Sequence, residues 1–130
     1  MSTEKIELPN MNHEFRLSVR GRETGKLYEG EFIYTRPNLF KKAQIDKMKT
    51  RLNGDLKNLP FETQVFHQMV ATLYNCLTKC PEWWKDCNYG QDLYDVEVIE
   101  EVWREVMTFE DTWNKKVYGP IEDKDIRISE

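Results

Sequence analysis

The first regular pattern along the chain is an alternation of apolar and polar residues over positions 14–35, interrupted by the stretch GRETG. Residues two apart share one face of a strand, and glycines supply the positive φ of a tight reversal. The pattern therefore predicts a β-hairpin. Gly30 lies among strand aromatics, which indicates a bulge or a ring lying across the backbone. The side chains expected to share faces of the two strands are Phe15, Leu17 and Val19, and Tyr28, Phe32 and Tyr34.

A basic helix is expected next, over residues 39–52. Its apolar positions, 39, 40, 43, 48 and 52, lie near helical spacing but form a thin stripe. Asn38 is a suitable N-cap, and the Asn-Gly pair at 53–54 is a stop signal. The helix carries the basic residues Lys41, Lys42, Lys47, Lys49 and Arg51.

Two further helices complete the pattern. One begins near Pro60 and is expected to run to Pro81, because the residue before a proline disfavours the helical region. It has the strongest three- and four-residue recurrence of apolar residues and is the expected core helix. The last begins after Asp95, an expected N-cap, and ends at the YGP sequence of 118–120. Its apolar stripe consists of Ile99, Val102, Trp103, Val106, Phe109 and Trp113.

These elements predict a single α+β domain over 14–118, an N-terminal β-hairpin packed on about three α-helices. Two strands alone are marginal in water, so the helices must cover the apolar face of the hairpin. Residues 1–13 are expected to form an N-terminal arm. Residues 119–130 are expected to form a polar tail, either an extended arm or, through Ile126 and Ile128, a short added strand.

Composition and charge narrow the class of protein. The chain is 39% hydrophobic and 32% charged, which suits a folded domain with a large polar surface. Residues 1–57 hold 12 Lys and Arg and 8 Asp and Glu, a formal +4, whereas residues 58–130 hold 7 and 15, a formal −8. Such halves can complement each other within the fold or between copies in an assembly. No secretory or membrane-spanning stretch occurs, so we expect the protein to stay in a cytosol with Cys76, Cys80 and Cys87 unpaired.

Several chemical interpretations fail on spacing. GRETGKL has only three residues between its glycines and a leucine where a phosphate-binding loop needs a hydroxyl. Cys76 and Cys80 would share a helix face, but His67 would lie opposite, so a fourth zinc ligand is missing. The acidic residues at 92–101 lack the sequence pattern of a calcium-binding loop. Asp95 is better explained as an N-cap, and the glutamates as the polar surface of a helix. We therefore expect no catalytic, cofactor-binding or metal residues, no cofactor, and no nucleic-acid partner, because the chain is acidic overall.

The stretch CPEWWKDCNYGQDLYD, residues 80–95, is the densest cluster of aromatic residues. Its adjacent tryptophans can fill two neighbouring gaps in a turn that follows a helix, each ring burying roughly 150–250 Å². The favoured interpretation is a fixed corner between two helices, and the alternative is that one ring is exposed as an interface anchor. The residues considered as interface candidates are Tyr28, Phe32, Tyr34, Trp83, Trp84 and Tyr89.

The segments GRETGKLYEGEF and CPEWWKDCNYGQDLYDVEVIEEVW resemble small proteins encoded among the structural genes of tailed bacteriophages, over about residues 15–113. The resemblance implies a non-enzymatic virion component, capsid-associated or in the tail or baseplate, that acts through protein–protein contacts. It would be made in the host cytoplasm and used in multiple copies with other phage structural proteins. The alternatives are a tail assembly chaperone or a small intracellular inhibitor that binds a host protein.

Overall fold

The fold is described from a computed structural model, over residues 9–54 and 58–119. The elements follow the order β1 (Asn12–Arg20), β2 (Leu27–Thr35), α1 (Leu39–Asn53), α2 (Phe61–Cys76), β3 (Leu77–Lys79), α3 (Glu82–Asp86) and α4 (Val96–Tyr118). The predicted α+β class, a hairpin packed against helices, is confirmed. The expected tail at 120–130 and most of the expected N-terminal arm lie outside the described residues, whereas Asn12 and His13 belong to β1.

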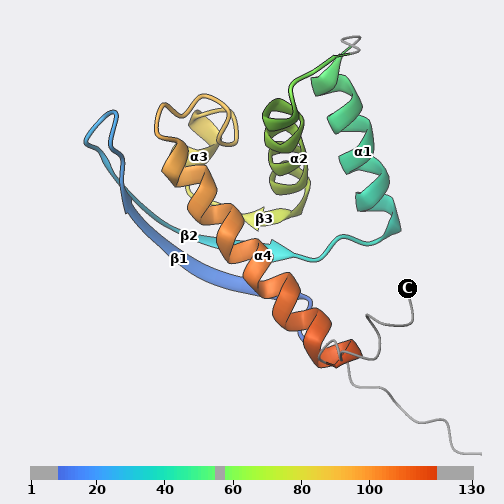
Figure 1. Cartoon of the computed structure of the whole chain (residues 1–130). Helices are drawn as coiled ribbons and strands as arrows, with labels where there is room; N and C mark the ends of the chain where they lie inside the picture. The colour runs from blue at the N-terminus through green and yellow to red at the C-terminus, as the bar shows by residue number, and fades with distance from the viewer. Residues whose placement is uncertain (1–8, 55–57, 120–130) are drawn as a thin grey trace, which may run out of the picture.

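The sheet has three antiparallel strands in the order β1-β2-β3. Its helices lie on one side, so the molecule has two layers (Figure 1). β1 and β2 pair along their whole length, from Asn12 opposite Thr35 to Arg20 opposite Leu27. The short β3 adds to the other edge of β2, with Lys79 opposite Ile33. The sequence pattern did not predict β3, because its three residues are too few to show a period of two.

The core lies between the inner face of the sheet and the helices. Phe15 and Phe32 stack with ring centroids 5.2 Å apart, and the alternation seen in the sequence matches their burial. α4 lies over β1 and supplies the predicted buried stripe, including Val102 and Val106, which are 0% exposed. The core also includes Leu17, Tyr28, Tyr34, Ile45, Met48, Val70, Leu73, Trp84, Val98 and Ile99.

Helices α1 and α2 correct two expectations. In α1 the buried residues are Ile45 and Met48, whereas Leu39 and Phe40 are 84% and 66% exposed. The Asn38 side chain caps the helix by accepting from the Lys41 N–H at 2.9 Å, as predicted. α2 was expected to reach Pro81 but ends at Cys76, because the chain turns into β3 and pairs with β2. Sheet pairing therefore overrode the local helical signal.

The aromatic corner holds its shape through packing and unusual backbone angles. Trp84, in the short helix α3, is 0% exposed and meets Phe32 edge-on with centroids 5.4 Å apart. Asn88, Tyr89 and Gly90 then take φ of 53°, 54° and 91°, which reverses the chain toward α4. The predicted corner is confirmed, and Trp84 is the ring that fills the core.

Gly30 shows why a glycine lies among the strand aromatics. A Cβ at this position would lie 2.6 Å from Pro81 Cγ and 3.4 Å from Trp83 Nε1. The Trp83 indole also donates to the Glu29 carbonyl at 2.8 Å. A proline and an indole thus lie across the backbone of β2, and the expectation of a ring across the strand is confirmed.

Candidate protein interaction surface

The structure places most of the aromatic interface candidates inside the domain. Four of them, Tyr28, Phe32, Tyr34 and Trp84, are between 0% and 8% exposed, so they pack within this chain. Trp83 and Tyr89 are half-buried and pack against the same core. The proposed anchors at the four buried positions are therefore corrected. Tyr28, Phe32 and Tyr34 lie on the face of the hairpin that the helices cover, and Trp84 fills the core from the short helix α3.

A groove between three helices is the surface that best fits partner binding. It has a volume of about 430 Å³ and opens between α1, α2 and α4. Its apolar lining comes from Ile45, Trp103 and Met107, with Pro37 at one end. Met107 is 38% exposed, although a large apolar residue on an amphipathic helix usually faces the core of the protein. The polar residues that line it are Lys42, Asp46, Gln68 and Thr72.

Two exposed apolar residues outside the lining lie, by helical spacing, on the same sides of α1 and α2 as lining residues. Leu39 precedes Asp46 by seven residues, nearly two helical turns, so both lie on the same side of α1. Val65 has the same relation to Thr72 on α2 and is 40% exposed. A contiguous exposed apolar surface with a polar rim is typical of interaction sites.

Two lysines of α1 lie at the groove, Lys42 in its lining and Lys49 beside Gln68, whereas Lys47 and Arg51 line a separate hollow with Tyr74. This helix carries Lys41, Lys42, Lys47, Lys49 and Arg51 against the single acidic residue Asp46. Among the described residues, none of these five forms an ion pair, although the Lys49 Nζ donates to Gln68 Oε1 at 2.9 Å. Lys42 and Lys49 therefore favour a partner with negative charge, with Asp46 as the one carboxylate in the lining.

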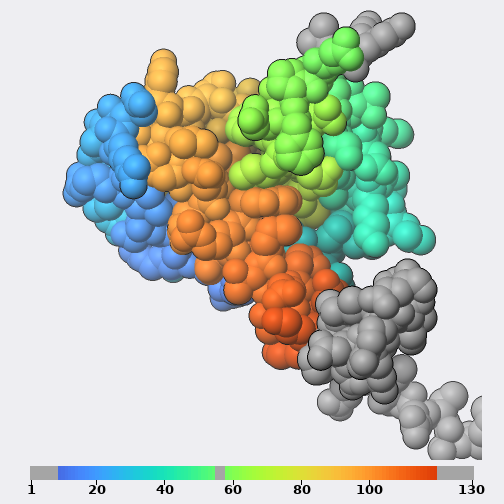
Figure 2. Space-filling model, viewed as in Figure 1, coloured from blue at the N-terminus to red at the C-terminus, as the bar shows by residue number. Residues whose placement is uncertain are grey.

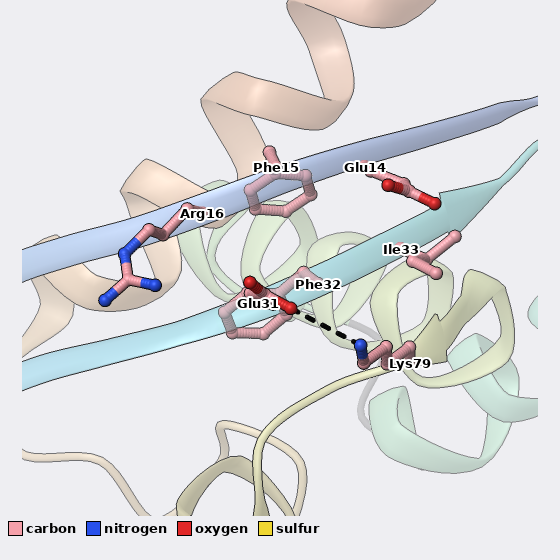
Figure 3. Close-up of a pocket in the computed structure, with 7 residues that line it drawn as sticks. All are labelled: Glu14, Phe15, Arg16, Glu31, Phe32, Ile33 and Lys79. Carbon is pink, nitrogen blue, oxygen red and sulfur yellow. Dashed lines mark hydrogen bonds and ion pairs between the residues drawn. The ribbon is translucent and has the colours of Figure 1, made fainter.

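A second hollow lies on the sheet and has a mixed charge. Figure 3 shows its lining, which includes Glu14, Arg16, Glu31 and Lys79, and its volume is about 270 Å³. The Lys79 Nζ approaches Glu31 Oε2 at 3.4 Å, and both side chains are more than half exposed. Arg16 pairs in the same way with Glu29 at 3.3 Å. Exposed pairs of this kind are typical of a solvated sheet face and contribute little energy.

Asp95 is the most buried charged group, and it binds the hairpin loop. Its carboxylate, 0% exposed, accepts from the N–H groups of Glu23 and Thr24 at 2.7 and 3.2 Å and from the Tyr28 hydroxyl at 3.1 Å. The Thr24 hydroxyl is a fourth donor. Burial alone would raise the pKa of Asp95, but the hydrogen bonds from Thr24, Glu23 and Tyr28 outweigh it and hold the pKa below its ordinary value. Asp95 occupies the predicted N-cap position of α4, but its side chain makes no cap hydrogen bond to that helix.

A second carboxylate, Glu110, fixes the other half of α4 to β2. It accepts from the Tyr34 hydroxyl at 2.6 Å and from the Arg36 Nε at 2.9 Å. The Arg36 guanidinium also lies 3.5 Å from the centre of the Trp113 ring. Burial, and then the hydrogen bond to Glu110, raise the pKa of Tyr34, so this phenol keeps its proton. Both carboxylates thus bind groups of this chain and hold α4 to the hairpin.

The cysteines are partly or fully buried. All three cysteines are free thiols, and burial raises the pKa of Cys76 to about 11, which makes it a poor nucleophile. Within residues 9–54 and 58–119, no group of three potential metal ligands comes together. Over the same residues, no helix combines the length and the apolar character that a membrane span needs.

Sequence reasoning missed the residues that form the groove. Trp103 was placed in the apolar stripe of α4 but lines the groove, and Met107, which the pattern did not single out, lies beside it. One signal was available: Leu39 and Phe40 occupy the first turn of α1, before the positions at which the helix reaches the core.

Comparison of the chain with protein-family models, with curated proteins and with solved structures finds no match.

Proposed function

We propose that this protein is a non-enzymatic interaction module that binds a partner protein in the groove between α1, α2 and α4. The observation that carries the proposal is the groove itself, in which Trp103 and Met107 line an open, mostly apolar surface. The occupant we propose is an acidic segment with large apolar side chains. Its apolar residues would fill the groove, and its carboxylates would face Lys42 and Lys49 of α1.

The setting we propose is a tailed-phage particle, where the partner would be another structural protein. This part of the proposal rests on the resemblance of residues 15–113 to small phage structural proteins. The uneven charge of the two halves of the chain supports contacts between opposite-signed surfaces in an assembly. A tail assembly chaperone or an intracellular inhibitor would use the same groove but would be absent from finished particles.

Two measurements test the proposal. Purified particles are probed for the protein, and the purified chain is titrated with individual particle proteins while its mass is followed by light scattering. The groove is tested with Leu39→Ser and Met107→Ser, which should weaken the complex by roughly tenfold or more each if the residues are central anchors. Tyr94→Ser is the control, because Tyr94 is 81% exposed, like Leu39 at 84%, but belongs to none of the three helices that form the groove.

The results separate the parts of the proposal. Loss of binding in the two groove variants, with normal binding by the Tyr94 variant, supports the groove as the docking site. Unchanged binding by both groove variants would reject it. Recovery of the protein only in infected-cell lysate would reject the virion setting and favour the chaperone or inhibitor alternative.

A further inference from the structure

The outer edge of β1 is a second surface that the proposed function does not use. β1 is at one end of the strand order, so its far edge has no neighbouring strand among the described residues (Figure 1). The Gly21 N–H donates to the Lys26 carbonyl at 2.8 Å, and the Arg36 N–H donates to the Met11 carbonyl at 2.9 Å. Gly21 and Met11 are odd-numbered, and hydrogen-bonded residues alternate along an antiparallel strand. The odd-numbered residues of β1 are therefore the ones whose backbone N–H and C=O groups bond to β2.

The even-numbered residues of β1 must then present their backbone groups to the free edge. In an antiparallel pair, residues alternate between those that exchange hydrogen bonds with the partner strand and those that point away from it. Glu14, Arg16 and Ser18 accordingly direct their N–H and C=O groups outward. These groups form a template for one more strand.

A hollow lies directly beside this edge. It has a volume of about 470 Å³ and is lined by four consecutive residues of β1, Arg16–Val19, and by Glu101 and Glu105 of α4. In Figure 2, the blue atoms of the hairpin and the orange atoms of α4 lie next to each other at the surface. An added strand would therefore have room, and its inward side chains would meet two carboxylates.

The spacing of the carboxylates matches that of a strand. Residues four apart on a helix are separated by about 6 Å along its axis, and alternate residues of a strand are separated by about 6.7 Å. Glu101 and Glu105 are about one-third exposed, at 35% and 38%, and they pair with Arg104 at 2.7 Å and with His13 at 3.4 Å, respectively. Each carboxylate has further acceptor sites for a cationic side chain.

We propose that the free edge of β1 binds an extended segment of a partner protein, as a fourth strand that carries Lys or Arg at alternate positions. The backbone of Glu14, Arg16 and Ser18 supplies the strand hydrogen bonds, and Glu101 and Glu105 select basic side chains. A second copy of this chain fits less well, because its own α4 would bring the same two glutamates against those of the first copy. This edge and the groove lie on opposite flanks of α4, so a negative result for one proposal does not reject the other.

The test is a nuclear magnetic resonance titration of the full-length, ¹⁵N-labelled chain with a synthetic peptide of about eight residues that alternates Thr and Lys. The expected result is saturable binding, with the largest amide shifts at Glu14, Arg16 and Ser18 rather than at the odd-numbered residues between them. A peptide of the same composition with contiguous lysines, and one that alternates Thr and Glu, should bind several times more weakly.

Two variants distinguish the backbone from the charges. Ser18→Pro removes an outward N–H and should abolish binding, while the β1–β2 hydrogen bonds stay intact, since proline is tolerated on the free side of an edge strand; Ser18→Ala is its control. The double variant Glu101→Gln with Glu105→Gln changes only partly exposed side chains and should weaken binding roughly threefold to tenfold.

The proposal would be overturned by a lack of saturable binding, or by shifts confined to α1 and the groove. Equal binding of the contiguous-lysine peptide would also overturn it, because general charge attraction would then explain the result. Shifts of the same edge amides with increasing protein concentration, in the absence of peptide, would identify a second copy as the occupant and reject the basic segment.

Discussion

A methyl group added at Gly90 should destabilise the fold by two separable effects. Gly90 has a φ of +91°, and its Cβ would lie 2.7 Å from Trp84 Cη2 and 2.9 Å from Cζ2. The Trp84 ring cannot move outward easily, because it is 0% exposed and packs edge-on against Trp83 and Phe32. The left-handed φ costs roughly 1–2 kcal/mol for an L side chain, and overpacking a core costs roughly 1–3 kcal/mol. Gly90→Ala should therefore lower the free energy of unfolding by about 2–5 kcal/mol.

The chain offers a control that isolates the backbone effect. Gly25 also has a positive φ, +74°, but a Cβ there would have nothing within 4 Å. Gly25→Ala should cost only the backbone strain, about 1–2 kcal/mol. The difference between the two variants measures the collision with Trp84. It should fall sharply when Gly90→Ala is made in a Trp84→Phe background, because phenylalanine lacks the outer ring atoms that the methyl group meets.

The assay is urea unfolding followed by far-ultraviolet circular dichroism, which does not depend on the tryptophan that is replaced. Unchanged denaturant slopes would show that the variants differ in stability and not in the compactness of either state. Two results would refute the reasoning: a Gly90→Ala cost no larger than that of Gly25→Ala, or an excess that persists in full when Trp84 is phenylalanine.

Three further predictions concern buried contacts. Asp95→Asn should lower stability at pH 7, and by less as the pH falls below about 3.9: the native pKa lies below this unfolded value, so the carboxylate's contribution is present above it and is lost as pH falls through the native pKa. If the difference in urea midpoint between the Asp95→Asn variant and the unmodified chain stays constant as the pH is lowered, the charge of the carboxylate is not the cause of the stability difference. In native protein at pH 8, iodoacetamide should modify the half-exposed Cys87 and leave the buried Cys76 unmodified until urea unfolds the chain, as mass spectrometry of the peptides would show. Gly30→Ala should cost about 1–3 kcal/mol by collision with Pro81, and an equal cost in a Pro81→Ala background would show that the strain lies elsewhere.

Much of the fold is determined by local signals in the sequence. The alternation from Phe15 to Tyr34 specifies a hairpin with one buried face, because the strand period leaves no other way to remove those side chains from water. Asn38 and the glycine at 54 set the ends of α1, since capping needs only residues close in sequence. The stripe of α4 and the corner around Trp84 follow from spacing and from the size of the apolar groups.

Tertiary contacts decided the features that depend on residues far apart in the sequence. β3 forms because β2 has a free edge at Ile33, although the segment looks helical by itself. Asp95 was expected to cap its own helix, but the hairpin loop, more than 70 residues earlier, offers it more donors. The groove exists because α4 lies over β1, which leaves Trp103 and Met107 uncovered beside α1 and α2. The sequence shows which side chains are apolar and are therefore expected to avoid water. Which of them remain exposed to solvent depends on how the helices are placed over the sheet.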